Sequence, residues 1–159
     1  TEYTDFVKSV TGCFLTLMSA RGYSSHIESW QSEDVKSGAF RVSLTSTEDN
    51  VKVLPYSECL FLFLYISERD KRSRLMVREK TKSVLSHLVF IPPDLSKRVV
   101  IICNNAEAFT ILDDYKHRLS FEGVLSCICM DRELAKDMMS EIYLKEPPKE
   151  NWDKWLLFM

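Results

Sequence analysis

The sequence contains little glycine, four residues in 159. Neither G-x-x-x-x-G-K nor G-x-G-x-x-G occurs, so the glycine-rich loops that bind nucleotide phosphates are missing. C-x-x-C is also absent, which argues against a zinc site. The three histidines, His26, His87 and His117, are far apart and have no obvious cysteine or serine partner for nucleophilic catalysis. We therefore expect no catalytic residues, no cofactor and no bound metal.

Long apolar runs are missing too, and no signal-peptide pattern is visible, so we expect no contact with a membrane. The length, 45% hydrophobic residues and 28% charged residues predict one globular domain with an appended tail. The chain opens at Thr1 rather than Met, which predicts a partial or trimmed chain. The odd number of cysteines inside apolar segments predicts reduced core thiols and a reducing compartment. These are Cys13, Cys59, Cys103, Cys127 and Cys129.

The chain is organised around the uninterrupted apolar run 59–66, which predicts a strand buried on both faces. A charged turn at 67–74 follows, then a helix over 75–88 with Met76, Val77 and Val84 turned inward, and an aliphatic strand at 99–103. Together they predict one βαβ unit.

Three further segments complete the predicted sheet. Strict alternation at 40–44 indicates a half-exposed edge strand, 51–54 a short return strand, and 124–130 another buried strand. The predicted fold class is therefore α/β, a small mixed sheet of about four strands with flanking helices and a C-terminal tail.

Helices and turns fill the remaining segments. A helix capped by Thr4 should end at Arg21-Gly22, and a short helix should start after Ser24 or Ser25. Asn104-Asn105 is interpreted as a turn into a helix, and a last helix is expected over 132–143. We predict a domain over 1–143 and a linker and tail over 144–159, the linker containing Pro147-Pro148.

A basic cluster follows the central strand. It admits two interpretations: a solvated helix face with local ion pairs, or a patch that contacts phosphates at the carboxyl end of the strand. Within fourteen positions lie Arg69, Lys71, Arg72, Arg74, Arg78, Lys80 and Lys82. The residues that we predict to lie nearest nucleic acid are Arg69, Lys71, Arg72, Arg74 and Arg78.

A metal-dependent nuclease is an alternative for a small α/β sheet of this kind. Such an enzyme needs two carboxylates and a lysine converging on one face. The central strand is apolar throughout its interior, which disfavours a metal site there. The available residues are Glu48, Asp49, Glu58, Glu68, Asp70 and Lys71.

The C-terminal tail is too apolar to remain uncovered, so we predict that it anchors to a partner. The predicted anchors are Trp152, Trp155, Leu156 and Phe158.

Three stretches resemble the N-terminal jaw domain of the fifth subunit shared by eukaryotic nuclear RNA polymerases. They are the helix ending in Arg21-Gly22-Tyr23, the apolar strand 59–66 with its charged turn, and Arg98 followed by the strand 99–103 and Asn104-Asn105. The likeness covers about residues 4–135. The family continues into an assembly domain, whereas this chain ends in the Trp-rich tail, so a fragment or a divergent member is expected.

The resemblance implies a restriction-endonuclease-like jaw in a non-catalytic structural subunit of a DNA-directed RNA polymerase. It implies a place near the downstream DNA cleft, a nuclear location, and the large and other polymerase subunits as partners, with downstream DNA close by. The alternatives left open are a nuclease-derived DNA-binding domain and a protein-interaction domain unrelated to transcription.

Overall fold

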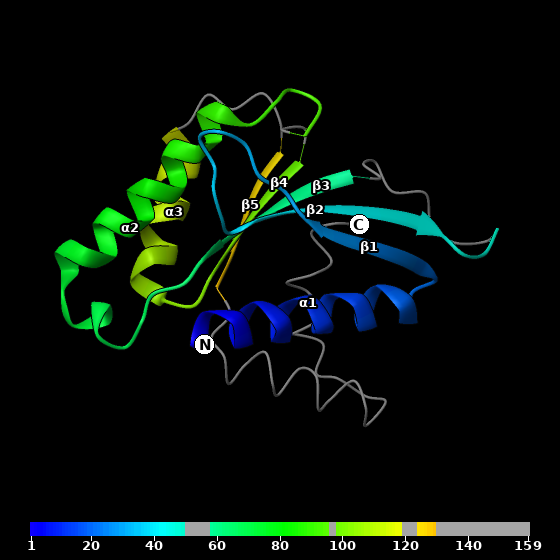
Figure 1. The fold of residues 1–159 in the computed structure, drawn as a ribbon, viewed down its shortest axis with the longest axis horizontal. Helices are drawn as coiled ribbons and strands as arrows, with labels where there is room; N and C mark the ends of the chain where they lie inside the picture. Colours follow the sequence, from blue (N-terminus) through cyan, green and yellow to red (C-terminus); the bar gives the residue numbers. More distant parts are fainter. Residues whose placement is uncertain (50–57, 96–97, 119–123, 130–159) are drawn as a thin grey trace.

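The fold is a five-stranded mixed sheet with helices on both faces (Figure 1). The computed structural model describes residues 1–49, 58–95, 98–118 and 124–129. In chain order the elements are α1 (Glu2–Ala20), β1 (Tyr23–Ser29), β2 (Ala39–Ser46), β3 (Glu58–Leu64), the short 3-10 helix η1 (Asp70–Arg72), α2 (Arg74–His87), the 3-10 helix η2 (Leu88–Phe90), β4 (Arg98–Cys103), α3 (Ala106–Arg118) and β5 (Val124–Cys129).

The strands lie in the order β1-β2-β3-β4-β5, with β3 in the middle. β1, β2 and β3 are antiparallel neighbours, whereas β3, β4 and β5 are parallel and are connected through α2 and α3. In β3 every residue after Glu58 is buried. The predicted fold class, a mixed α/β sheet with flanking helices and a central βαβ unit, is confirmed.

Alternation along β3 divides the core between the two faces. Phe61 and Phe63 face α1, where Phe14 meets Phe61 edge-on with ring centroids 5.0 Å apart. Leu60 and Leu62 face the opposite layer, formed by α2 and α3 (Figure 1). A strand covered on both sides buries both of its faces, which is why 59–66 reads as a continuous apolar run.

The opening helix begins earlier than the sequence predicts. Thr1, not Thr4, is the N-cap: its side-chain oxygen accepts a hydrogen bond from the Thr4 N–H at 3.2 Å. The predicted end is confirmed, because α1 stops at Ala20 and Gly22 has a φ of 87°. Glycine adopts this left-handed conformation without a steric penalty, and the chain turns directly into β1.

Three expectations about the elements need correction. Tyr23–Ser29 forms β1, not a short helix after Ser24 or Ser25. β1 therefore occupies the edge of the sheet, and β2, predicted as an edge strand, has a neighbour on each side. Met76, predicted to point inward, is 40% exposed. The predicted return strand 51–54, the helix 132–143, the linker and the tail lie outside the described residues.

None of the five cysteines, all of which lie in the described ranges, forms a disulfide; Cys13, Cys59 and Cys103 are buried, and Cys127 and Cys129 are half-buried. Burial raises the pKa of Cys59 to about 12 and that of Cys127 to about 11. The pKa of Cys103 is raised chiefly by a hydrogen bond with Cys129. Protonated thiols are poor nucleophiles and poor metal ligands, so Cys59, Cys103 and Cys127 act as packing side chains of the core. No helix in the described ranges is both long enough and apolar enough to cross a bilayer.

Candidate interaction surface

The connection between β3 and α2 is fixed to the neighbouring strand by one side chain. Asn104, just after β4, is buried, and its amide bonds to both backbone groups of Ile66, just after β3. The Ile66 N–H donates to Asn104 Oδ1 at 2.7 Å, and Asn104 Nδ2 donates to the Ile66 carbonyl at 2.9 Å. The carboxyl ends of two parallel strands are thereby held together, at the edge where α/β sheets usually carry their sites.

Local hydrogen bonds shape the charged turn that follows. The Ser67 hydroxyl oxygen accepts a hydrogen bond from the Asp70 N–H at 3.2 Å, and the Ser67 carbonyl accepts one from the Lys71 N–H at 3.0 Å. Ser73 then caps α2, because its side-chain oxygen accepts from the Met76 N–H at 3.3 Å. The turn is a compact structure that holds its basic side chains outward.

Two of the seven basic residues have acidic partners. Lys71 Nζ lies 2.8 Å from Glu68 Oε1, and Lys80 pairs with Asp70. Hydrogen bonds from the two lysines hold the pKa of the Glu68 and Asp70 carboxyls below their usual values. Lys71, predicted to lie near nucleic acid, is therefore partly neutralised within the turn.

The other five basic side chains are exposed and make no ion pair within the described part of the chain. They are Arg69, Arg72, Arg74, Arg78 and Lys82. The cluster thus contains local ion pairs, and it also carries cations that an external anion can reach.

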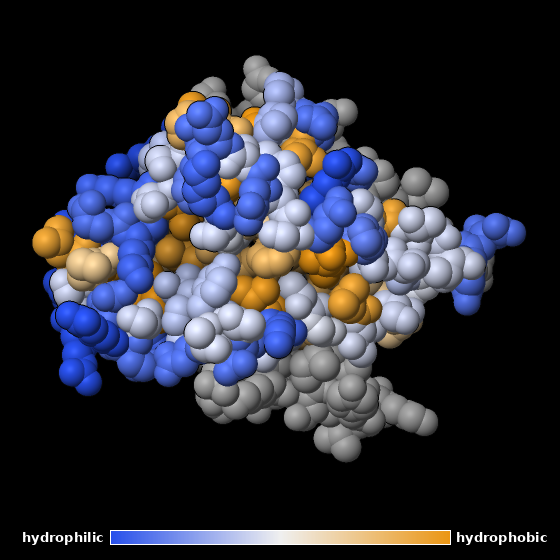
Figure 2. Space-filling view, in the orientation of Figure 1, coloured by the Kyte–Doolittle hydropathy of each residue, from blue (hydrophilic) through white to orange (hydrophobic). Residues whose placement is uncertain are grey.

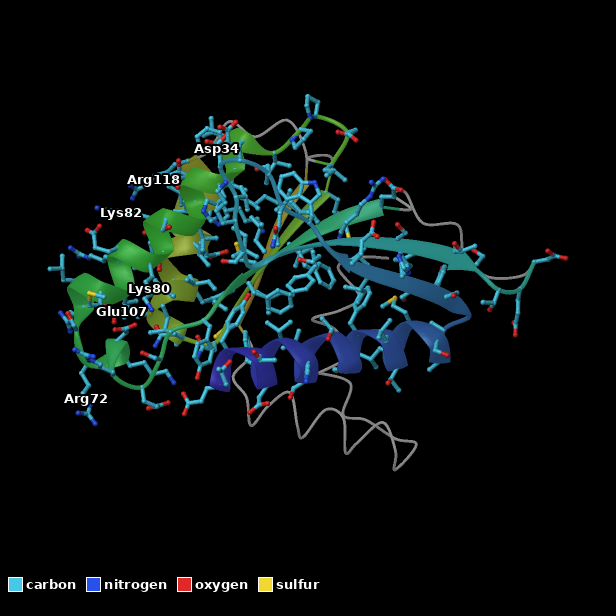
Figure 3. The ribbon with its side chains drawn as sticks, viewed as in Figure 1. Asp34, Arg72, Lys80, Lys82, Glu107 and Arg118 are labelled. Carbon is cyan, nitrogen blue, oxygen red and sulfur yellow. The ribbon has the colours of Figure 1, made fainter. Side chains whose placement is uncertain are left out.

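The amino end of α2 concentrates this positive charge. Arg74 is the first residue of the helix, and the first turn contains no acidic residue. Backbone N–H groups already place partial positive charge at a helix N-terminus, so Arg74 adds to it instead of opposing it. Arg72 extends from the adjoining turn at one end of the molecule (Figure 3). Hydrophilic side chains cover much of this side of the surface (Figure 2).

Arg78 belongs to a second feature, a groove of about 530 Å³ between α2 and α3. Its walls include Arg78, Lys82 and Val89 from α2 and η2, and Tyr115 and Arg118 from α3. The five predicted residues are therefore divided between the turn and the groove. Sequence reasoning missed the α3 contribution, because the apolar pattern of the helix includes Tyr115, which is in fact 38% exposed. The spacing of Tyr115 and Arg118, one helical turn apart, was the available signal.

The carboxylates of the nuclease alternative do not converge. Glu58 begins β3 and receives two hydrogen bonds of 3.0 Å from Arg41 Nη2. Asp70 follows the opposite end of β3, and a seven-residue strand spans roughly 20 Å. Glu48 and Asp49 lie in the exposed turn after β2. Among the residues that the structure describes, no three acidic, histidine or cysteine side chains gather as metal ligands would.

The predicted anchors Trp152, Trp155, Leu156 and Phe158 fall outside the described residues. Comparison of the whole chain with protein-family models, with curated proteins and with solved structures finds no match.

Proposed function

We propose that the chain is a non-catalytic structural subunit of a multisubunit DNA-directed RNA polymerase, placed near the downstream DNA cleft in the nucleus. One observation carries the proposal: the three stretches behind the family resemblance belong to a single packed unit. Phe14 of α1, Phe61 of β3 and Val100 of β4 share one core cluster.

The exposed cations support a position beside DNA. Arg69, Arg72 and Arg74 follow one another along the turn and the amino end of α2, without an ion pair among the described residues. Contacts of this kind go to phosphates and are independent of base sequence.

A non-catalytic role fits the state of the carboxylates. Glu58 is occupied by Arg41 and Asp70 by Lys80, at opposite ends of β3. Each would have to lose its cationic partner and move toward the other before the two could share a divalent ion.

The principal test is affinity purification of the tagged full chain from cells that express it, followed by mass spectrometry. We expect the two large polymerase subunits to co-purify in near-stoichiometric amounts. Their absence, with the tagged chain folded and recovered, would contradict the proposal.

A DNA-binding assay tests the place near DNA separately. Replacing Arg69, Arg72 and Arg74 by Gln should weaken duplex binding and reduce the slope of log K against log salt by about 0.9 for each phosphate that the protein no longer neutralises. The matched control replaces three exposed lysines elsewhere, Lys8 and Lys36 together with Lys116, and should leave the slope unchanged. Equal slopes for both variants would show that the turn does not contact phosphates.

The tail, if it anchors to a large subunit as the sequence predicts, provides a further readout. Deleting 147–159 should abolish co-purification and leave the melting temperature of the domain nearly unchanged. A large fall in melting temperature with co-purification intact would instead assign Trp152 and Trp155 to the core of this chain.

A nuclease-derived DNA-binding domain is the second candidate, favoured by the order of elements: a helix, three antiparallel strands, then a crossover to a parallel strand. It would bind DNA with the same salt dependence and without polymerase subunits. Cleavage of DNA or RNA in magnesium or manganese, lost in Asp70→Ala or Glu58→Ala, would overturn the non-catalytic assignment.

A further inference from the structure

The groove between α2 and α3 is lined by one stripe of side chains from each helix. Arg78, Lys82 and Val89 recur at helical spacing along α2 and η2, and Ile111 and Tyr115 do the same along α3. Side chains three and four apart share one face of a helix, so the two stripes run the length of the groove. This geometry accepts an elongated ligand.

Apolar side chains inside the groove are open to solvent. Val89 is 82% exposed and Tyr115 is 38% exposed, beside the half-buried Ile111 and the almost fully buried Leu85. Phe90, which follows Val89 in η2, is 47% exposed. Exposed apolar side chains beside a polar rim are typical of an interaction site.

The charge on the rim is positive. Arg78 and Lys82 lie four residues apart on one face of α2 and make no ion pair within the described ranges. Like charges at this spacing destabilise a helix by a few tenths of a kcal/mol, which a bound anion would reverse. On the other wall, Arg118 lies 3.9 Å from Asp114, with both side chains more than 70% exposed, so that pair is weak.

Together these features select a ligand that is both apolar and acidic. A nucleic-acid backbone would satisfy Arg78 and Lys82, but it would leave the exposed apolar surface of Val89 and Tyr115 without apolar contacts. An amphipathic helix can instead place apolar residues at i, i+4 and i+7 between α2 and α3 and direct carboxylates to the basic rim.

We propose that the groove between α2 and α3 binds an acidic amphipathic helix of a partner protein. The docked helix would cover Val89 and Tyr115 and pair its carboxylates with Arg78, Lys82 and Arg118. The proposal does not depend on the polymerase assignment.

The test is fluorescence anisotropy on the full chain with a labelled peptide of about 18 residues, long enough to form a helix. The peptide carries leucine at i, i+4, i+7 and i+11, flanking glutamates, and alanine elsewhere. One control peptide has lysine in place of each glutamate, and a second is a scramble of the same composition. We expect the acidic helix to bind at least about tenfold more tightly than either control.

Variants locate the binding. Lys82→Glu should weaken binding of the acidic peptide about tenfold and strengthen binding of the lysine peptide. The introduced carboxylate would lie one helical turn from Arg78, an arrangement that favours the helix, so the variant should fold. Lys8→Glu makes the same charge change on α1, on the other face of the sheet, and should alter neither affinity more than about twofold. Val89→Ser removes an exposed apolar side chain and should weaken binding of the acidic peptide about fivefold.

Any of three results would overturn the proposal. The acidic peptide and its scramble could bind equally tightly, Lys82→Glu and Lys8→Glu could change the affinity for the acidic peptide equally, or Val89→Ser could leave that affinity unchanged. In the last case, a DNA duplex that displaces the peptide would identify the groove as a phosphate-binding surface.

Discussion

Asn104 satisfies both backbone polar groups of Ile66 with a single amide, across 38 positions of sequence. Because all of these atoms are buried, Asn104→Leu, which is similar in size, would leave a donor and an acceptor without partners. Each unsatisfied buried group costs about 1–3 kcal/mol, so for the two groups we expect a loss of about 2–6 kcal/mol in the free energy of unfolding, measured by urea denaturation. Thr110→Ala, which removes an exposed side-chain bond on α3, is the control and should cost under about 1 kcal/mol. A similar small loss for both variants would contradict this role of Asn104.

The contact between α1 and the sheet should be equally sensitive. Phe14 is fully buried against Phe61, so Phe14→Ala is expected to lower the free energy of unfolding by about 3–5 kcal/mol. The neighbouring Leu15 is 40% exposed, and Leu15→Ala should cost much less. Comparable losses at the two positions would mean that α1 does not pack on the sheet through Phe14.

Stability should fall on mild acidification because of His87. Partial burial lowers the pKa of this imidazole, so the folded chain resists a proton that the unfolded chain accepts near pH 6.5. The associated stability is present above pH 6.5 and is lost as the pH falls below it. Denaturation at several pH values between about 5 and 8 should show this dependence, and His87→Gln should reduce it. An identical pH dependence in both proteins would rule His87 out as its source.

Cys59 should react with thiol reagents only when the fold opens. With a pKa of about 12, only about one Cys59 thiol in ten thousand is ionised at pH 8, and the side chain is 3% exposed. Mass-spectrometric mapping after labelling at about pH 8 should find Cys59 unmodified in the native chain and labelled in urea. Labelling should accelerate in Phe14→Ala, which destabilises the same core cluster. Rapid labelling of the native wild type would show that β3 is accessible.

Buried strands were the most predictable part of the fold. The apolar runs at 59–66 and 99–103 identified β3 and β4, because a strand covered on both faces leaves little choice of residue type. β1 was not predictable in the same way. Its sequence is rich in serine, and only Tyr23 is buried, so its extended structure depends on pairing with β2. Strand propensity is set largely by such neighbours.

The candidate surface was only partly predictable, because charge pairing and grooves are tertiary features. Sequence placed Arg69 to Arg74 after the central strand but could not show that Lys80 would reach back ten positions to Asp70. Nor could it show that Arg78 and Tyr115 line one groove, since the groove depends on the packing of two helices separated by a strand.

The mixed order of the sheet also sets the pace at which it can assemble. β1 and β2 meet through a short connection, with Ser29 opposite Phe40, whereas β3 and β4 bring Leu60 beside Val99, 39 positions away. Distant pairings demand more loop closure before any stabilising contact forms, and folding rates fall as their share rises. The β1–β2 hairpin should therefore form early, whereas β3 and β4 can pair only after α2, which connects them, has packed against the sheet. Until then the face of β3 that packs against α2 and α3 is uncovered, and a nascent chain is most vulnerable to self-association in that interval.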